Sequence, residues 1–111
     1  MAEARTENFT RRELTLADYA KAISHPARIS ILTALAKKQD CICGDLVLDL
    51  PLAQSTVSQH LKALKEIGLI KGTVDGTKSR YCIDWTTFEK MQSLMSGWMD
   101  KLGHFKKENS C

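Results

Sequence analysis

The stretch from 52 to 70 constrains the fold more than any other part of this 111-residue chain. Val57, Leu61 and Leu64 recur at helical spacing, which predicts a helix over about 53–67 with one buried face. The opposite face is polar and almost uncharged, unlike the Glu–Lys pairing that is typical of a merely solvated helix. Short amide and hydroxyl side chains instead suit contact with base edges in the major groove of DNA.

The flanking segments complete an arrangement that is known from DNA-binding proteins. Residues 45–50 are expected to form a short helix that ends before Pro51. Gly68 is expected to end the next helix as a left-handed cap. The Asp-Gly pair at 75–76 predicts a hairpin between two β-prone runs that together span about 69–84. The sequence therefore predicts a mainly α fold with a small β-hairpin, a winged helix-turn-helix.

Four motifs in this chain resemble those of the ArsR/SmtB family of bacterial metal-responsive repressors. They are Ser24-His25-Pro26-Ala27-Arg28 with Ile31-Leu32, Cys41-Ile42-Cys43-Gly44-Asp45-Leu46, Gln54-Ser55-Thr56-Val57-Ser58-Gln59-His60-Leu61 with Leu64, and Gly68-Leu69-Ile70 with Gly76 and Arg80-Tyr81. The resemblance runs from about 14 to 105. It implies a homodimer, joined through its terminal helices, that binds a palindromic operator in double-stranded DNA. It also implies a repressor that an inducer releases from the operator.

The length of the chain predicts one domain. We expect a flexible N-terminal tail over 1–10, a winged helix-turn-helix domain over 11–105 and a C-terminal tail over 106–111. His25 invites interpretation as a metal ligand, but its place directly before Pro26 favours a role as a helix cap.

A seam of large apolar side chains follows the last expected helix, over about 86–105. Its members alternate at steps of three and four residues, as in a coiled-coil seam. They are Phe88, Met91, Met95, Trp98, Leu102 and Phe105. Such a seam packs either within the chain or against a partner. The resemblance implies a dimer interface here, to which the first helix adds Leu14 and Tyr19.

The polar helix face and the hairpin together give the predicted DNA-binding residues. Gln pairs with adenine and Ser with several bases, whereas Lys and Arg mainly hold phosphates. The set is Gln54, Ser55, Thr56, Ser58, Gln59, His60, Lys62, Lys78 and Arg80. His60 either touches a phosphate or only supports the helix-turn-helix. The net charge of +3 does not by itself separate DNA binding from an ordinary solvated surface.

Cys41 and Cys43 are the clustered thiols of the chain. Thiolates are soft ligands, so the pair favours arsenite or another soft metal ion as an inducer. The groups that could complete a site are Cys82, Cys111 and His104. Arsenic and cadmium sensors of the family carry the second cysteine directly before the Asp, whereas Gly44 intervenes here. The alternative is that both cysteines are small apolar residues at the start of a helix.

Several classes of protein are disfavoured by the composition. No apolar run approaches the roughly 20 residues of a membrane helix, and the polar N-terminus is unlike a signal peptide. Four cysteines in such a chain indicate reduced thiols or a metal site in the cytoplasm rather than a disulfide framework. No catalytic constellation is present, so we expect neither an enzyme nor a required cofactor. The alternatives that stay open are a thiol-redox or inducer-independent regulator and a protein-interaction module.

Overall fold

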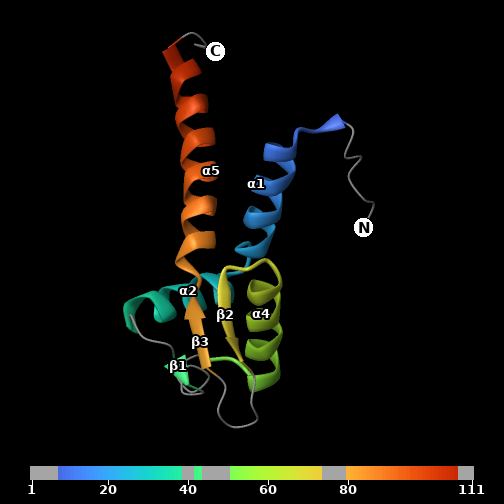
Figure 1. Cartoon of the computed structure of the whole chain (residues 1–111), viewed down its shortest axis with the longest axis vertical. Coiled ribbons are helices and arrows are strands. Elements are labelled where there is room, and N and C mark those ends of the chain that lie inside the picture. The colour runs from blue at the N-terminus through green and yellow to red at the C-terminus, as the bar shows by residue number, and fades with distance from the viewer. Residues whose placement is uncertain (1–7, 39–41, 44–50, 74–79, 108–111) are drawn as a thin grey trace.

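The computed structural model describes residues 8–38, 42–43, 51–73 and 80–107, and its elements follow the predicted order (Figure 1). They are helices α1 (Arg11–Ala22), α2 (Pro26–Lys38), α4 (Gln54–Glu66) and α5 (Trp85–His104), strands β1 (Ile42–Cys43), β2 (Ile70–Thr73) and β3 (Arg80–Ile83), and the short 3-10 helix η2 (Phe105–Lys107). The prediction of a mainly helical fold with a small antiparallel hairpin is confirmed. The helix expected over 45–50 lies outside the described residues, as do Lys78, Cys41 and Cys111.

The helix starts follow from local hydrogen bonds. At α1 the backbone N of Glu13 donates to Thr10 Oγ1 at 3.1 Å, and the backbone N of Thr10 donates to Glu13 Oε1 at 2.9 Å, which is a capping box. At α2 the backbone N of Ala27 donates to His25 Nδ1 at 3.0 Å, which confirms the predicted capping role of that histidine. At α5 the cap is Asp84, so this helix begins one residue before the predicted position.

The sheet has one strand that the sequence did not predict. Antiparallel β2 and β3 form the wing, and β1 pairs with the other side of β3, giving the order β1-β3-β2. In this pairing Ile42 lies opposite Tyr81 and Cys43 opposite Arg80. The segment that carries Cys43 is thus a short edge strand of the sheet, and the helix that we expect directly after it lies outside the described residues.

One apolar core joins the end of α1, α2, α4, the sheet and the start of α5. The α4 face that was predicted to be buried is buried: Val57 and Leu64 are 0% exposed and Leu61 is 4% exposed. The other core residues are Tyr19, Ala22, Ile31, Leu35, Leu69, Ile70, Ile83 and Met91. Because this core fixes one side of α4, the opposite side of the helix is turned toward solvent.

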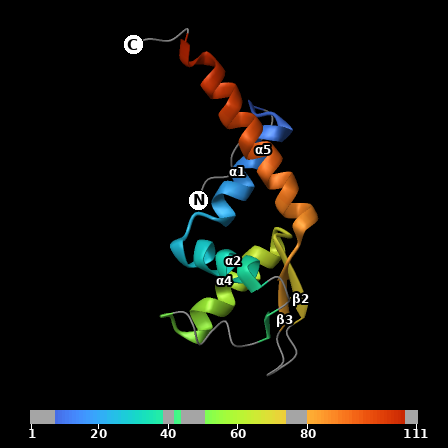
Figure 2. The same ribbon diagram turned by 90° about the vertical axis from the view of Figure 1, so that its left-hand side faces the viewer.

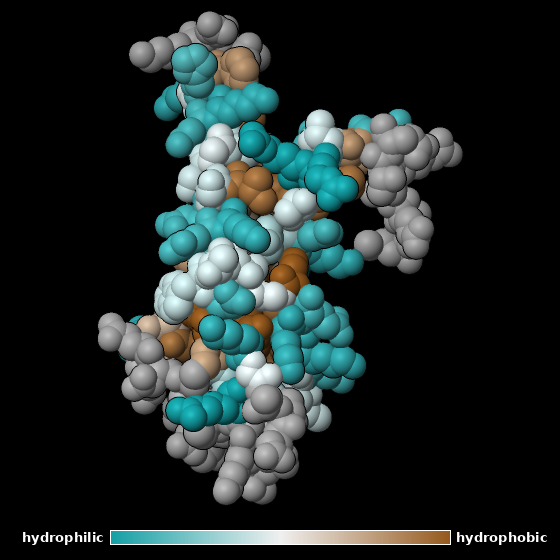
Figure 3. Space-filling view, in the orientation of Figure 1, coloured by the Kyte–Doolittle hydropathy of each residue, from teal (hydrophilic) through white to brown (hydrophobic). Residues whose placement is uncertain are grey.

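The helix α5 rises from this body beside α1 and continues beyond it (Figures 1 and 2). Its seam is divided. Met91 is buried within the chain, and Phe88 and Met95 pack against the core. Farther along, Trp98, Leu102 and Phe105 are 48%, 50% and 43% exposed. Figure 3 shows the apolar patches that interrupt the hydrophilic surface along α5 and where α5 meets α1.

The predicted tails fall largely outside the described residues, although the expected C-terminal tail starts within the 3-10 helix η2. None of the helices in the described part of the chain combines the length and the apolar character needed to cross a bilayer.

Candidate nucleic-acid interface

The outer face of α4 presents small polar groups to solvent. Ser55, Ser58, Gln59 and Lys62 are exposed, and Thr56 is half-buried. Gln54 opens the helix, but its side chain is outside what the structure describes. The first turn of α4 carries no acidic residue, and its cap residue makes no side-chain hydrogen bond. The backbone N–H groups of that turn are therefore suited to donate hydrogen bonds to a phosphate oxygen.

A tight connection joins α4 to the wing. The backbone N of Gly68 donates to Lys65 O and that of Leu69 to Leu64 O, each at 3.0 Å. These two bonds form a Schellman motif, in which the residue after the helix adopts the left-handed conformation. Gly68 does so with φ +86°, which confirms its predicted role. The C-terminal end of α4 thus fixes the orientation of this helix relative to the wing.

The wing carries an exposed cation at the start of its second strand. Arg80 begins β3, lies opposite Thr73 of β2 and is exposed. The two strands approach so closely that a Cβ at Gly72 would meet the backbone carbonyl of Arg80. Only glycine fits at that position without separating the strands. The geometry therefore holds β2 and β3 close together where Arg80 presents its positively charged side chain.

His60 is the predicted interface residue that the fold places elsewhere, on the inner side of α4. It is only 9% exposed, and Arg28 Nε donates to its Nδ1 at 3.0 Å. This environment favours the second of the two roles expected for His60, support of the helix-turn-helix. The sequence spacing indicates this burial, because His60 follows Val57 by three residues and precedes Leu64 by four, as the residues of the buried face do. Arg28 was seen in the sequence as part of a motif but not as a partner of α4.

The cysteines form no complete metal site among the residues that are described. Within those residues, no group of three or more His, Cys, Asp or Glu side chains could hold a metal ion. Cys82 on β3 is disulfide-bonded, so the expectation of uniformly reduced thiols was wrong for this residue. Its partner is one of Cys41, Cys43 and Cys111, whose side chains lie outside the described part. The pairing of β1 with β3 nevertheless brings the backbone of Cys43 to the strand that carries Cys82.

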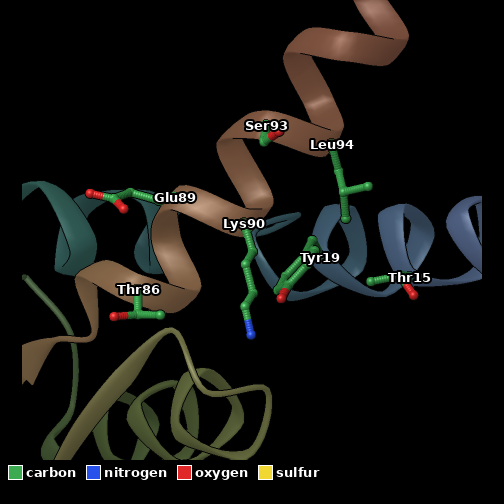
Figure 4. A pocket seen from close by; sticks show the side chains of 7 residues that line it. All are labelled: Thr15, Tyr19, Thr86, Glu89, Lys90, Ser93 and Leu94. Atoms are coloured by element: carbon green, nitrogen blue, oxygen red, sulfur yellow. The ribbon is translucent and has the colours of Figure 1, made fainter.

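An open pocket lies between α1 and α5 (Figure 4). Its lining comes from both helices and consists of Thr15, Tyr19, Thr86, Glu89, Lys90, Ser93 and Leu94. The side chains of Tyr19 and Lys90 project into the space between the helices. No thiol or imidazole is among these lining residues, so the pocket does not have the ligands of the expected soft-metal site.

Comparison with known proteins gives the family. The family model described as bacterial regulatory protein, arsR family, matches residues 25–71, which span α2, β1, α4 and the start of β2. The transcriptional regulator MJ1325 of Methanocaldococcus jannaschii is 37% identical over 68 residues, covering 60% of this chain and 75% of that protein. The chain belongs to the ArsR family of bacterial regulatory proteins. This confirms the resemblance seen in the sequence.

Two further relatives extend the comparison. The HTH-type transcriptional regulator CmtR of Mycobacterium tuberculosis is 39% identical over 74 residues, which cover 65% of this chain and 60% of that protein. This ArsR-family chain thus matches less than two thirds of the length of CmtR. The solved structure of an ArsR-like transcriptional regulator from Rhodococcus sp. RHA1 superposes with a TM-score of 0.63 at 23% identity, covering 91% of this chain and 98% of that one. The winged helix-turn-helix fold is confirmed, and these relatives are regulators rather than enzymes.

Proposed function

We propose that this ArsR-family protein binds double-stranded DNA in the cytoplasm and represses transcription. The observation that carries the proposal is the division of α4 into two faces. Its buried side fixes the helix on the core, while Ser55, Ser58 and Gln59 face solvent. Together with Gln54 and Thr56, these side chains read bases, and Lys62, Lys78 and Arg80 hold phosphates.

The working form is a homodimer on a palindromic operator. The distal half of α5 and the first residue of η2 expose four large apolar side chains, which a second copy of the chain covers. They are Trp98, Met99, Leu102 and Phe105, from 43% to 60% exposed. A two-fold dimer presents its two recognition helices to half-sites about one helical turn apart, so the operator repeats the symmetry of the protein.

The inducer is arsenite or another soft metal ion bound by Cys41 and Cys43, with Cys82 or Cys111 as a third thiol. The pairing of β1 with β3 supports Cys82, because it places the Cys43 segment beside the strand of that residue. Three thiolates satisfy a trivalent soft ion better than two. The site requires reduction of the Cys82 disulfide, since a thiol in a disulfide cannot ligate a metal.

The disulfide at Cys82 favours a second candidate, a thiol-redox regulator. In this case two cysteine thiols lose two protons and two electrons to a hydroperoxide, which is reduced to an alcohol and water. The reduced and disulfide forms then differ in operator affinity. This candidate uses the same DNA-binding surface and differs only in the signal.

The DNA-binding proposal is tested by selecting duplexes from a random-sequence pool with the reduced wild-type protein. Enrichment of a palindromic sequence is expected. Gln59→Ala should then relax sequence preference and cost about 1–3 kcal/mol if its contact is bidentate. Arg80→Ala should weaken all duplexes alike, and Lys101→Ala, on α5, is the matched control for loss of one exposed positive charge. A pool without enrichment would refute the proposed function.

The signal is tested on the enriched duplex with reduced protein. Arsenite should release wild type but not Cys43→Ser, whereas release by a hydroperoxide in the absence of metal would favour the redox candidate. If Cys41→Ser, Cys43→Ser and wild type all respond alike to both agents, the sensor lies elsewhere.

A further inference from the structure

Arg28 joins three elements of the fold at one point. From α2, its Nε donates to Nδ1 of His60 on α4 at 3.0 Å, and its Nη1 donates to the backbone oxygen of Ala22 at 3.1 Å. Ala22 is the last residue of α1. The planar guanidinium carries both bonds in a fixed relative geometry. One side chain therefore ties the reading helix to the end of the helix that runs beside α5.

The bond to His60 exists in only one protonation state. Because Arg28 Nε–H is the donor, Nδ1 of His60 must hold a lone pair, and the proton of the neutral ring sits on Nε2. An imidazolium at His60 would set an N–H against an N–H, and its positive charge would lie beside a guanidinium. The bridge between α4 and α1 is thus made by neutral His60 and broken by protonated His60.

The surroundings of His60 do not compensate a positive charge. Arg28 faces it from α2, the ring of His25 faces it from the α1–α2 connection with centroids 4.4 Å apart, and α1 contributes the carbonyl of Ala22. Nδ1 of His25 is itself occupied by the backbone N of Ala27. Among the described residues, no carboxylate makes a hydrogen bond or ion pair with the side chain of Arg28, His25 or His60.

We propose that His60 is a positioning residue for DNA binding: its neutral ring, through Arg28, sets the angle of the reading helix, and its protonation weakens operator binding. The proposal rests on the proposed function, in which α4 reads bases. Base contacts tolerate little displacement, and in a dimer both reading helices must match successive grooves at once. A link from α4 to α1 fixes that match, since α1 packs beside the helix that is proposed to join the two copies.

The direction of the pH effect follows from the same environment. Burial, then the nearby His25 and then Arg28 lower the pKa of His60 below its ordinary value of 6.5. At neutral pH the ring is neutral and the bridge is intact. As the pH falls through the lowered pKa, the ring gains a proton, Arg28 loses its acceptor, and affinity for the operator falls.

The test compares wild type with His60→Asn on the duplex selected by wild type from a random pool. The Oδ1 of Asn takes the place of Nδ1 as acceptor and does not titrate in this range. Affinities are measured by fluorescence anisotropy from pH 5 to 8 at constant ionic strength. Each is divided by the affinity for an unrelated duplex, which removes the general tightening of DNA binding as histidines become charged.

For wild type, we expect this ratio to fall at least fivefold between pH 7.5 and pH 5, the acid end of the range. His60→Asn should stay within about threefold of wild type at pH 7.5 and show no fall in acid. His60→Leu, which has no acceptor, should bind weakly at every pH. His25→Asn keeps the helix cap, and His104→Asn removes an exposed histidine on α5, so both should retain the acid fall.

Parallel pH curves for wild type and His60→Asn would overturn the proposal, as would an acid fall that disappears only in His25→Asn. If His60→Asn does not fold, ¹⁵N NMR of the wild-type protein can instead measure the protonation of the two ring nitrogens of His60. An unprotonated Nδ1 at pH 7.5 whose protonation follows the loss of affinity supports the proposal, and a protonated Nδ1 at pH 7.5 refutes it. Failure to enrich any duplex would instead refute the proposed function.

Discussion

Trp98→Asp should break the proposed dimer and leave the fold of each copy intact. Trp98 lies on the distal part of α5 and is 48% exposed in the single chain. A Trp side chain presents about 200–250 Å², so roughly 100 Å² per copy is left for a partner to cover. At about 25 cal/mol per Å² this is about 2.5 kcal/mol, or about 5 kcal/mol for the two copies of a symmetric interface. The dissociation constant should therefore rise by roughly three orders of magnitude or more.

The added carboxylate increases the effect, because an unpaired charge in an apolar interface carries a desolvation cost. Sedimentation equilibrium over a range of concentrations measures the dissociation constant, and circular dichroism checks that the helices persist. Ser96→Asp is the matched control, since it places the same charge two residues away on an exposed side of the same helix. If Trp98→Asp remains as dimeric as Ser96→Asp, the exposed half of the seam is not the interface.

Three other outcomes follow from local geometry. Gly68→Ala places a side chain at φ +86°, where its Cβ would make only ordinary van der Waals contact with Thr87, so urea unfolding should show a loss of about 1 kcal/mol from backbone strain. Gly72→Ala should cost more than that, because its Cβ meets the carbonyl of Arg80 and the wing strands must separate; equal losses for the two variants would contradict this reasoning. The free energy of unfolding of wild type should fall as the pH drops below 6.5, because unfolded His60 takes up its proton first. That fall should be smaller in His60→Asn, as measured by urea titrations at several pH values.

The features that could be predicted from the sequence depend on interactions between residues close together in the chain. The inner face of α4 follows from a 3.6-residue period, and His25 caps α2 because its ring stands two residues from the first free N–H group. The same period placed His60 among the buried positions of α4. However, His60 has a polar ring and lies in a motif expected to bind DNA. A contact with phosphate was therefore expected as one of its two roles, although its spacing indicated burial.

Contacts between distant parts of the chain could not be predicted in this way. The bond from Arg28 to His60 joins residues 32 positions apart, and β1 exists only because the edge of β3 offers it partners. The periodicity of the α5 seam identified one face of the helix but not where along it the core ends. That division depends on how far the helix extends past the body, which is a property of the fold as a whole.

The position of β1 changes the expected route from the inducer to DNA. If the helix expected over 45–50 follows directly after the cysteines, a soft ion at Cys41 and Cys43 could reshape its start and so displace α4. In the described part of the chain, however, β1 pairs with β3 and not with α4. We therefore expect a change at this segment to act first on the wing, where Arg80 lies opposite Cys43.

The two routes have different signatures in DNA binding. If the inducer acts through the wing, arsenite-loaded protein loses phosphate contacts but keeps its choice of bases. Loss of the Arg80 contact from both subunits should then reduce the salt dependence, the slope of log K against log salt, by about 2. Discrimination between the selected duplex and one with a single altered base pair should stay within about twofold. Because displacement of α4 would instead abolish that discrimination, an arsenite-loaded protein that binds both duplexes equally would refute the route through the wing.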